Sequence, residues 1–160
     1  MPAILPMRAE RYTAYVEAAI VTYAQDNIAT GRWSEVGALA RSRADFESLL
    51  PHGLATPDNY LYEILAAENG HVLGFVWLFI EQKHGAVSAY IYDLEIKPEF
   101  RRRGHAMRAL QALESVALTA GATRIGLNVF ANNAEAQALY RKLGYAPTNL
   151  NMYKPLTSNV

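Results

Sequence analysis

The sequence predicts one α/β domain over residues 1–160, with a sheet that is antiparallel at first and then gains a parallel strand. Apolar residues alternate along several stretches that are separated by turns containing Gly or Pro, which is typical of a meander. A strand ending at Pro98 is then followed by a helical stretch and a further alternating stretch, which indicates a parallel crossover. A chain of 160 residues suits one domain with its own core and is short for two.

The first 53 residues predict a short strand and two helices. The strand is expected at Ala3 to Met7. The first helix should run from Glu10 to roughly Asn27, where apolar residues recur every three or four positions. The second should run from Ser34 to Leu50 and end at Pro51-His52-Gly53. We expect these two helices, their connection and the stretch from Tyr60 to Glu81 to shape a substrate pocket.

The next segment predicts three antiparallel strands, at Tyr60 to Ala67, Val72 to Glu81 and Ser88 to Ile96. Asn69-Gly70 and His84-Gly85 mark the two turns between them. The third strand leads directly into the stretch with the strongest functional signal.

The last segment predicts a helix from Gly104 to about Ala120 and a strand from Thr123 to Phe130 that runs parallel to the strand ending at Ile96. Another helix should start at a cap on Asn132 or Asn133 and end at Gly144, and a final strand should cover Tyr145 to Lys154.

A basic turn joins the strand ending at Ile96 to the helix that follows. It contains Arg101, Arg102, Arg103 and Gly104. Unpaired N–H groups and the positive end of the helix dipole should lie at the start of this helix, where phosphate binds well. Gly104 and the small Ala106 let an anion approach the main chain, and the arginines add positive charge.

Asn133, Ala136 and Tyr140 stand at positions i, i+3 and i+7 of the last predicted helix and so share one face. Asparagine offers a donor and an acceptor to an amide-bearing ligand, alanine leaves room, and a tyrosine hydroxyl can give a proton.

Overall composition restricts the chemistry. The formal net charge is zero and the pI is near 6.9, so we expect no nucleic-acid partner. There is no cysteine, which excludes a thiolate metal site and an acyl-cysteine intermediate, and we expect no metal. The N-terminus lacks a leader pattern and no apolar run reaches membrane-spanning length, so we expect a cytoplasmic protein without a membrane partner.

Two motifs resemble those of the GNAT N-acetyltransferases. Arg101-x-x-Gly104-x-Ala106 resembles the acyl-CoA pyrophosphate loop, and Asn133-x-x-Ala136-x-x-Leu139-Tyr140-x-Lys142-Leu143-Gly144-Tyr145 resembles the closing signature. The resemblance covers roughly Val72 to Lys154. It implies a three-layer α/β (α+β) fold with a central mixed sheet of about six or seven strands, splayed between strands four and five, and about four flanking helices.

The resemblance also implies a site for acetyl-CoA. By position, the pyrophosphate is held by Arg101, Arg102, Arg103, Gly104, His105 and Ala106, with His105 contributing its main-chain N–H. The pantetheine arm pairs with the main chain near Leu94 to Ile96. Asn133 contacts this arm, Ala136 lies beside it, and Tyr140 sits near the sulfur as the acid for the leaving thiolate.

The implied reaction is direct attack of a primary amine, on a small molecule or a peptide N-terminus, on the thioester. Glu95 is our preferred base, with Asp93, water or no base as alternatives, because Asn128 and Tyr90 occupy positions where the family often has glutamate. Strand alternation puts Asp93 and Glu95 on the face of Ile91 unless a bulge intervenes.

A catalytically idle acyl-CoA-binding or sensing module is the alternative function. We expect the protein to be a monomer or a homodimer.

Overall fold

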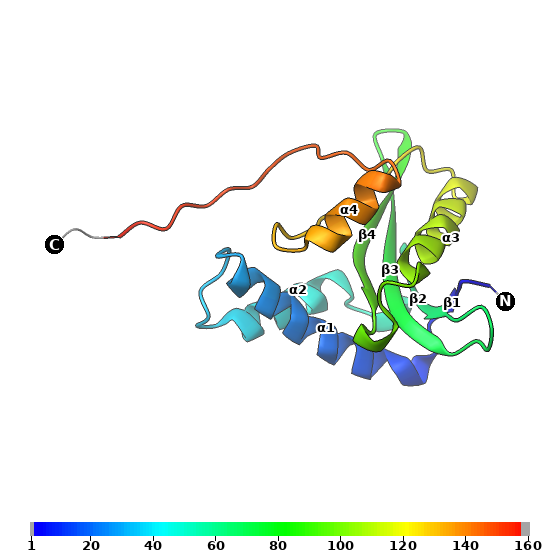
Figure 1. The fold of residues 1–160 in the computed structure, drawn as a ribbon, viewed down its shortest axis with the longest axis horizontal. Coiled ribbons are helices and arrows are strands. Elements are labelled where there is room, and N and C mark those ends of the chain that lie inside the picture. The colour runs from blue at the N-terminus through cyan, green and yellow to red at the C-terminus, as the bar shows by residue number, and fades with distance from the viewer. Residues whose placement is uncertain (1, 158–160) are drawn as a thin grey trace. The chain divides into compact units, whose positions relative to one another are not determined.

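The computed structural model describes residues 2–157 and contains a mixed five-stranded sheet (Figure 1). The strands lie in the order β1-β2-β3-β4-β5, antiparallel except for the parallel pair β4 and β5. They are β1 (Ile4–Pro6), β2 (Asn59–Leu65), β3 (Val72–Lys83), β4 (Ala86–Ile96) and β5 (Ile125–Leu127). The predicted α/β class is confirmed. Among the described residues the sheet has five strands, where six or seven were expected.

Four α-helices accompany the sheet in the described part of the chain. They are α1 (Ala9–Ala29), α2 (Ala38–Leu49), α3 (His105–Thr119) and α4 (Ala134–Lys142), and short 3-10 turns cover Gly53–Ala55 and Pro98–Phe100. Within residues 2–157, none of these helices is long and apolar enough to cross a bilayer.

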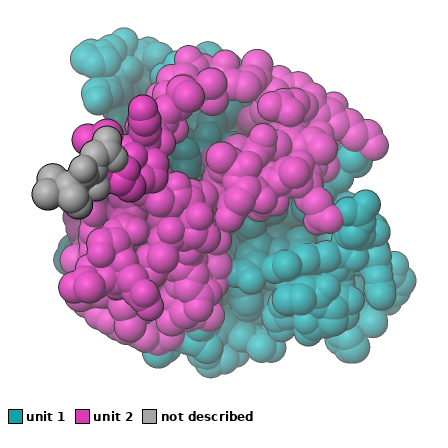
Figure 2. Space-filling model, turned by 60° about the vertical axis from the view of Figure 1, so that its left-hand side comes forward, with its two compact units in different colours: residues 1–15, 50–128 teal, residues 16–49, 129–160 magenta. Residues whose placement is uncertain are grey.

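The chain divides into two compact units, coloured separately in Figure 2. The first contains the residues up to Tyr15 and those from Leu50 to Asn128, and so holds the whole sheet, α3 and the start of α1. The second contains Val16–Leu49 and the residues from Val129 onward.

A β-bulge in β4 changes which side chains share a face of the sheet. Trp77 of β3 pairs with Asp93, but the next residue, Leu78, pairs with Ile91, so Tyr92 is an extra residue on β4. Directly paired residues of antiparallel strands lie on the same face. Asp93 therefore lies on the opposite face from Ile91, because the bulge that was named as the exception to simple alternation is present.

The two faces of the sheet differ in character. The face with Val76, Leu78 and Ile91 is buried and apolar, and α3, whose Leu110 and Leu113 are fully buried, contacts β3 and β4. The other face, named here the Phe75 face, carries the β3 residues Phe75, Trp77 and Phe79 with their β4 partners Glu95, Asp93 and Tyr90. Polar and aromatic groups therefore gather on the Phe75 face.

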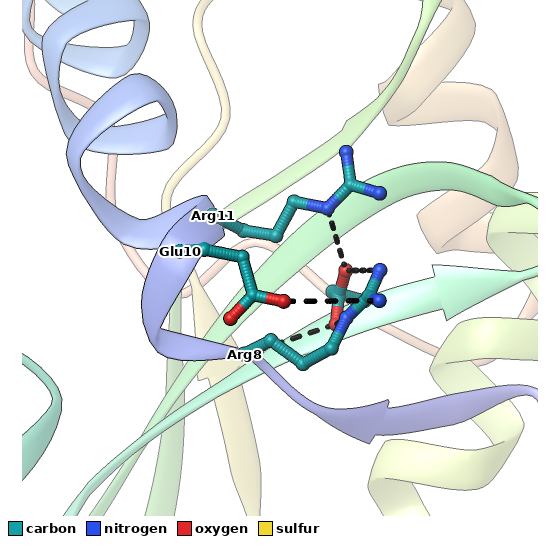
Figure 3. A network of polar contacts seen from close by, with 4 residues as sticks. Arg8, Glu10 and Arg11 are labelled. Atoms are coloured by element: carbon teal, nitrogen blue, oxygen red, sulfur yellow. Dashed lines mark hydrogen bonds and ion pairs between the residues drawn. The ribbon is translucent and has the colours of Figure 1, made fainter.

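A buried carboxylate fixes the start of α1 on the Phe75 face. Glu63 of β2 pairs with Phe75 and is only 2% exposed. Its two carboxylate oxygens accept hydrogen bonds from Nε and Nη2 of Arg8, each at 3.1 Å, and Arg11 Nε lies 3.4 Å from Oε1 (Figure 3). This network joins β2 to the first turn of the helix.

The second unit has its own small core. The Trp33 ring packs edge-on against Tyr23, with ring centroids 5.3 Å apart, and Arg41 lies over its indole at 4.3 Å. The buried Ser42 hydroxyl donates to the Ile20 carbonyl oxygen at 2.7 Å and joins α2 to α1. Trp33 therefore has a core role.

Three predicted elements differ from the structure. The second helix begins at Ala38 rather than Ser34, because Gly37 adopts φ 76° and interrupts helical geometry just before it. The strand predicted at Thr123 to Phe130 is reduced to Ile125–Leu127. The strand predicted at Tyr145 to Lys154 is absent, and no regular structure forms there.

Candidate functional site

The loop between β4 and α3 ends in a helix N-terminus that is open to an anion. Gly104 is the N-cap of α3 at φ 81°, and no side chain caps the helix. The N–H groups of the first turn, including those of His105 and Ala106, have no acceptor within the helix. A Cβ on Gly104 would meet no atom within 4 Å. The loop thus combines free space with main-chain donors and the positive helix end, which suits phosphate.

The three arginines of the loop are not equivalent. Arg101 turns back toward β4, where its Nε donates to the Ile96 carbonyl oxygen at 2.7 Å and its Nη2 lies 3.7 Å from Oε1 of Glu95. Arg101 therefore stabilises the end of β4 through these two contacts. Arg102 and Arg103 are exposed in the loop, and Arg102 has a positive φ of 62°.

The end of β4 presents main-chain groups along an edge that β5 does not cover. Lys97 N–H donates to the Leu73 carbonyl oxygen at 2.8 Å, so the main-chain groups of Lys97 face β3. The direction of the main-chain N–H and C=O groups alternates from one residue to the next along a strand. The main-chain groups of Glu95 therefore also face β3, whereas those of Leu94 and Ile96 face the opposite edge of β4. β5 pairs with β4 only on the N-terminal side of the bulge. The N–H and C=O groups of Leu94 and the N–H of Ile96 are therefore directed as an extended ligand would require, whereas the Ile96 carbonyl oxygen accepts the hydrogen bond from Arg101.

Asp93 and Glu95, the two candidate bases, lie on the Phe75 face with different partners. Asp93 Oδ2 accepts a hydrogen bond of 2.6 Å from the Tyr15 hydroxyl, whose ring packs 5.3 Å from that of Phe75. Burial, and then the charges of Asp93 and Glu95, raise the pKa of Tyr15 well above its ordinary value. Tyr15 thus stays a proton donor to Asp93, while Glu95 has Arg101 beside it.

Tyr15 is the residue of this region that sequence reasoning missed. It belongs to the apolar stripe of the first predicted helix, so the pattern assigned it to the core. A buried tyrosine hydroxyl usually needs a hydrogen-bond partner, which is the signal that could have linked it to a strand carboxylate.

The second unit holds the remaining predicted site residues on or beside α4. Of the two predicted cap residues, Asn132 and Asn133, the structure has Asn133 as the N-cap of α4. Its Oδ1 accepts a hydrogen bond of 3.2 Å from the Ala136 N–H. The helix ends at Gly144 (φ 96°), with Tyr145 N–H donating to the Tyr140 carbonyl oxygen at 2.9 Å. The Tyr140 ring is half-buried, 5.6 Å from that of Tyr145.

Comparison with known proteins gives one consistent result. Residues 23–145 match the family described as the Acetyltransferase (GNAT) family. Two relatives from Bacillus subtilis strain 168 are named uncharacterized N-acetyltransferases. YdgE is 35% identical over 94% of this chain and 95% of its own length, and YycN is 33% identical over 96% and 97%. The crystal structure of YycN superposes with a TM-score of 0.90, covering 97% of this chain and 99% of the YycN chain.

Proposed function

Because the chain belongs to the GNAT family of acetyltransferases, we propose that it is an acetyl-CoA-dependent N-acetyltransferase that acts on a primary amine. The acceptor would be a small molecule or a peptide N-terminus. The observation that carries the proposal is the part of the β4 edge at Leu94 and Ile96 that β5 does not pair with, which leads within eight residues to the N-terminus of α3 at Gly104, where no side chain caps the helix. The family match includes residues of both compact units, which supports their working as one acetyltransferase domain.

The residues around this edge suit acetyl-CoA in charge and in hydrogen bonding. First-turn N–H groups at His105 and Ala106 would bind its pyrophosphate, with Arg102 and Arg103 adding charge. Main-chain groups of Leu94 and Ile96 would pair with the amides of its pantetheine arm. Arg101 would act mainly by holding the end of β4, because its guanidinium already bonds the Ile96 carbonyl oxygen.

Two residues of the second unit complete the proposed cofactor set. Asn133 would use its amide nitrogen as a donor to the pantetheine arm, since its oxygen caps α4. Ala136, one turn into the helix, would leave room for that arm.

In the proposed reaction, acetyl-CoA supplies a thioester carbonyl that a neutral amine attacks directly. A main-chain N–H on the β4 edge would stabilise negative charge on the carbonyl oxygen, a contribution of about 3 kcal/mol. Glu95 would accept a proton from the incoming ammonium, directly or through water, with Asp93 as the alternative base. Tyr140 would donate a proton to the departing sulfur.

Calorimetric binding of coenzyme A tests the anion site. Gly104→Glu should abolish binding, because its carboxylate would compete with the pyrophosphate for the main-chain N–H groups at the start of α3 and repel its negative charge. Gly121→Glu is a matched control, since Gly121, beside the other end of α3, also has a positive φ (88°) and a Cβ added there would meet nothing within 4 Å. Both variants add one negative charge at a glycine with a positive φ. Equal loss of binding in both, or binding that survives Gly104→Glu, would contradict the site.

Release of the coenzyme A thiol across a panel of amines tests the reaction. The chain has no cysteine, so a thiol reagent reports only the released product. Tyr140→Phe should lower kcat more than it changes KM, whereas Tyr145→Phe should leave both nearly unchanged. An unaltered kcat in Tyr140→Phe would remove it from the acid role.

The pH dependence of the same rate identifies the base. Glu95→Gln should slow the reaction most near neutral pH and recover as pH approaches about 10.4, where a lysine-like amine loses its proton unaided. If Asp93→Asn shows this pattern and Glu95→Gln does not, Asp93 is the base.

The ion pair between Glu95 and Arg101 favours the idle acyl-CoA-binding module, because the carboxylate of the preferred base already has a guanidinium partner 3.7 Å away. Binding of coenzyme A without thiol release from any amine would favour that function.

A further inference from the structure

An aromatic cluster lies on the Phe75 face of the first unit. The ring of Tyr92, the extra residue of the bulge, contacts three other rings. They belong to Trp77, Phe79 and Tyr90, with centroids 4.7, 5.9 and 5.0 Å from that of Tyr92. These three residues are on the Phe75 face, so their contacts place the Tyr92 ring on the same face. Together with Tyr92 they are named here the ring cluster.

The ring cluster has a fixed floor and an accessible surface. Trp77 is buried, and its Nε1 donates a hydrogen bond of 2.7 Å to Asn59 Oδ1, which holds the indole in place. Tyr92 is 38% exposed, and Phe79 and Tyr90 are half-buried. Aromatic pairs are more favourable than burial of the same apolar area alone. A further ring placed on the exposed part of Tyr92 would therefore be stabilised as the existing rings are.

A carboxylate stands directly next to the ring cluster. Asp93 follows Tyr92 in the chain, and the bulge brings it to the Phe75 face together with Glu95. The Tyr15 hydroxyl donates to Oδ2 of Asp93. An ionised carboxylate offers about four acceptor positions on its two oxygens, so this bond alone does not fill them. An aromatic surface and an acceptor for an ammonium group therefore lie one residue apart on β4.

Other carboxylates of the Phe75 face lie beside cations, so this face has little to attract a polycation. Glu81 Oε1 lies 4.0 Å from Lys83 Nζ, and Glu95 Oε1 lies 3.7 Å from Arg101 Nη2. A ligand with several ammonium groups would bring them close to these cations, and like charges repel. A ligand with one ammonium group and one aromatic ring matches the surface better.

We propose that the acceptor is an arylalkylamine, a primary amine joined to an aromatic ring by a short aliphatic linker, as in phenethylamine. Its ring stacks on Tyr92 and its ammonium group is held by Asp93. This proposal rests on the proposed function, because it names the acceptor of that reaction. Leu94 and Ile96, which would pair with the pantetheine arm, follow Asp93 on the same strand, so an amine held there would be near the thioester. Tyr92 then determines specificity and takes no part in proton transfer.

Thiol release with three acceptors tests the preference for an aromatic ring. Phenethylamine should have a kcat/KM about fivefold higher than cyclohexylethylamine, which has the same linker and a saturated ring, because only the aromatic ring can stack. Spermidine, a polycation without a ring, should be a poorer acceptor than either. Equal kcat/KM for phenethylamine and cyclohexylethylamine, or a preference for spermidine, would overturn the proposal.

Substitution of Tyr92 tests its role in the same assay. Tyr92→Leu should raise the KM for phenethylamine about fivefold with little change in kcat, because the lost contact is made equally before and during the reaction. Tyr92→Phe keeps the ring and should keep the parent KM. Tyr60→Leu is the matched control, because Tyr60 is 45% exposed and pairs with Leu78 on the opposite face of the sheet. An unaltered KM in Tyr92→Leu, or an equal increase in Tyr60→Leu, would contradict the proposal.

Calorimetry separates failure of this proposal from failure of the proposed function. Tyr92→Leu should bind coenzyme A as the parent does, which also shows that the variant folds. With coenzyme A present, it should bind phenethylamine about fivefold more weakly than the parent. Binding of phenethylamine that depends on Tyr92 but leads to no thiol release would support the ring site and refute the transferase. Thiol release from both ring compounds with equal efficiency would support the transferase and refute the ring site.

Discussion

Gly74 of β3 is the position where adding one methyl group should disturb the sheet most. A Cβ there would lie 1.9 Å from the carbonyl oxygen of Glu95, and the ordinary contact range begins at 3.4 Å. That oxygen is main chain and faces β3, so it cannot rotate away, and the two strands would have to separate by roughly 1.5 Å. Overpacking costs about 1–3 kcal/mol, and each weakened ladder hydrogen bond adds about 1 kcal/mol. We expect Gly74→Ala to lower the free energy of unfolding by about 3 kcal/mol, or the Tm by about 6–12 °C.

Gly126 of β5 supplies the matched control for this measurement. A Cβ there would lie 3.5 Å from the Tyr90 ring, an ordinary contact, and neither glycine has a positive φ. Gly126→Ala should therefore gain about 0.5 kcal/mol from the lower chain entropy of alanine. Urea unfolding followed by circular dichroism gives both values. If Gly74→Ala stayed within about 0.5 kcal/mol of the parent, the steric argument would be refuted.

Three further predictions concern stability and use the same urea assay. Glu63→Gln should cost about 2 kcal/mol, because a buried acceptor of charge-assisted bonds becomes neutral, whereas Glu10→Gln, exposed and at 3.9 Å from its arginine, should stay within about 0.5 kcal/mol of the parent. Because folding raises the pKa of Tyr15, the contribution of this hydroxyl to the free energy of unfolding should be complete below pH about 10 and be lost as pH rises through the folded-state pKa. The free energy of unfolding should therefore fall less steeply with alkaline pH in Tyr15→Phe than in the parent, and an equal slope in both would contradict this. Asn133→Ala should cost about 1 kcal/mol by removing the cap of α4, while Asn132→Ala, one residue before the cap, should cost much less; equal costs would reject the cap.

The sequence predicted the connection from β4 to α3 well because its signals are local. Pro98 ends the strand, Gly104 starts the helix, and the apolar spacing after Ala106 defines the buried helix face. The cap at Asn133 and the stop at Gly144 were predicted for the same reason, since each depends on one residue and its nearest main-chain groups.

The rest depends on partners that are distant in sequence. The bulge at Tyr92 arises in the register between β3 and β4, which alternation within β4 cannot reveal. The Arg101 side chain was expected to bind phosphate, but in the structure it donates a hydrogen bond to the Ile96 carbonyl oxygen and pairs with Glu95. The alternating pattern after Tyr145 predicted a strand that does not form, because alternation alone does not supply the neighbouring strand with which a strand must pair.

Because of the bulge, the presence of Asp93 and Glu95 on the Phe75 face depends on the number of residues in β4 and not on which side chain stands at position 92. Deleting residue 92 would restore strict two-residue periodicity and either turn Asp93 and Glu95 toward the apolar core or shift the whole strand end against β3. Replacing Tyr92 with another residue would keep the extra residue, and both carboxylates would stay where they are. In evolution and in engineering, this segment should therefore tolerate substitutions far better than single-residue deletions.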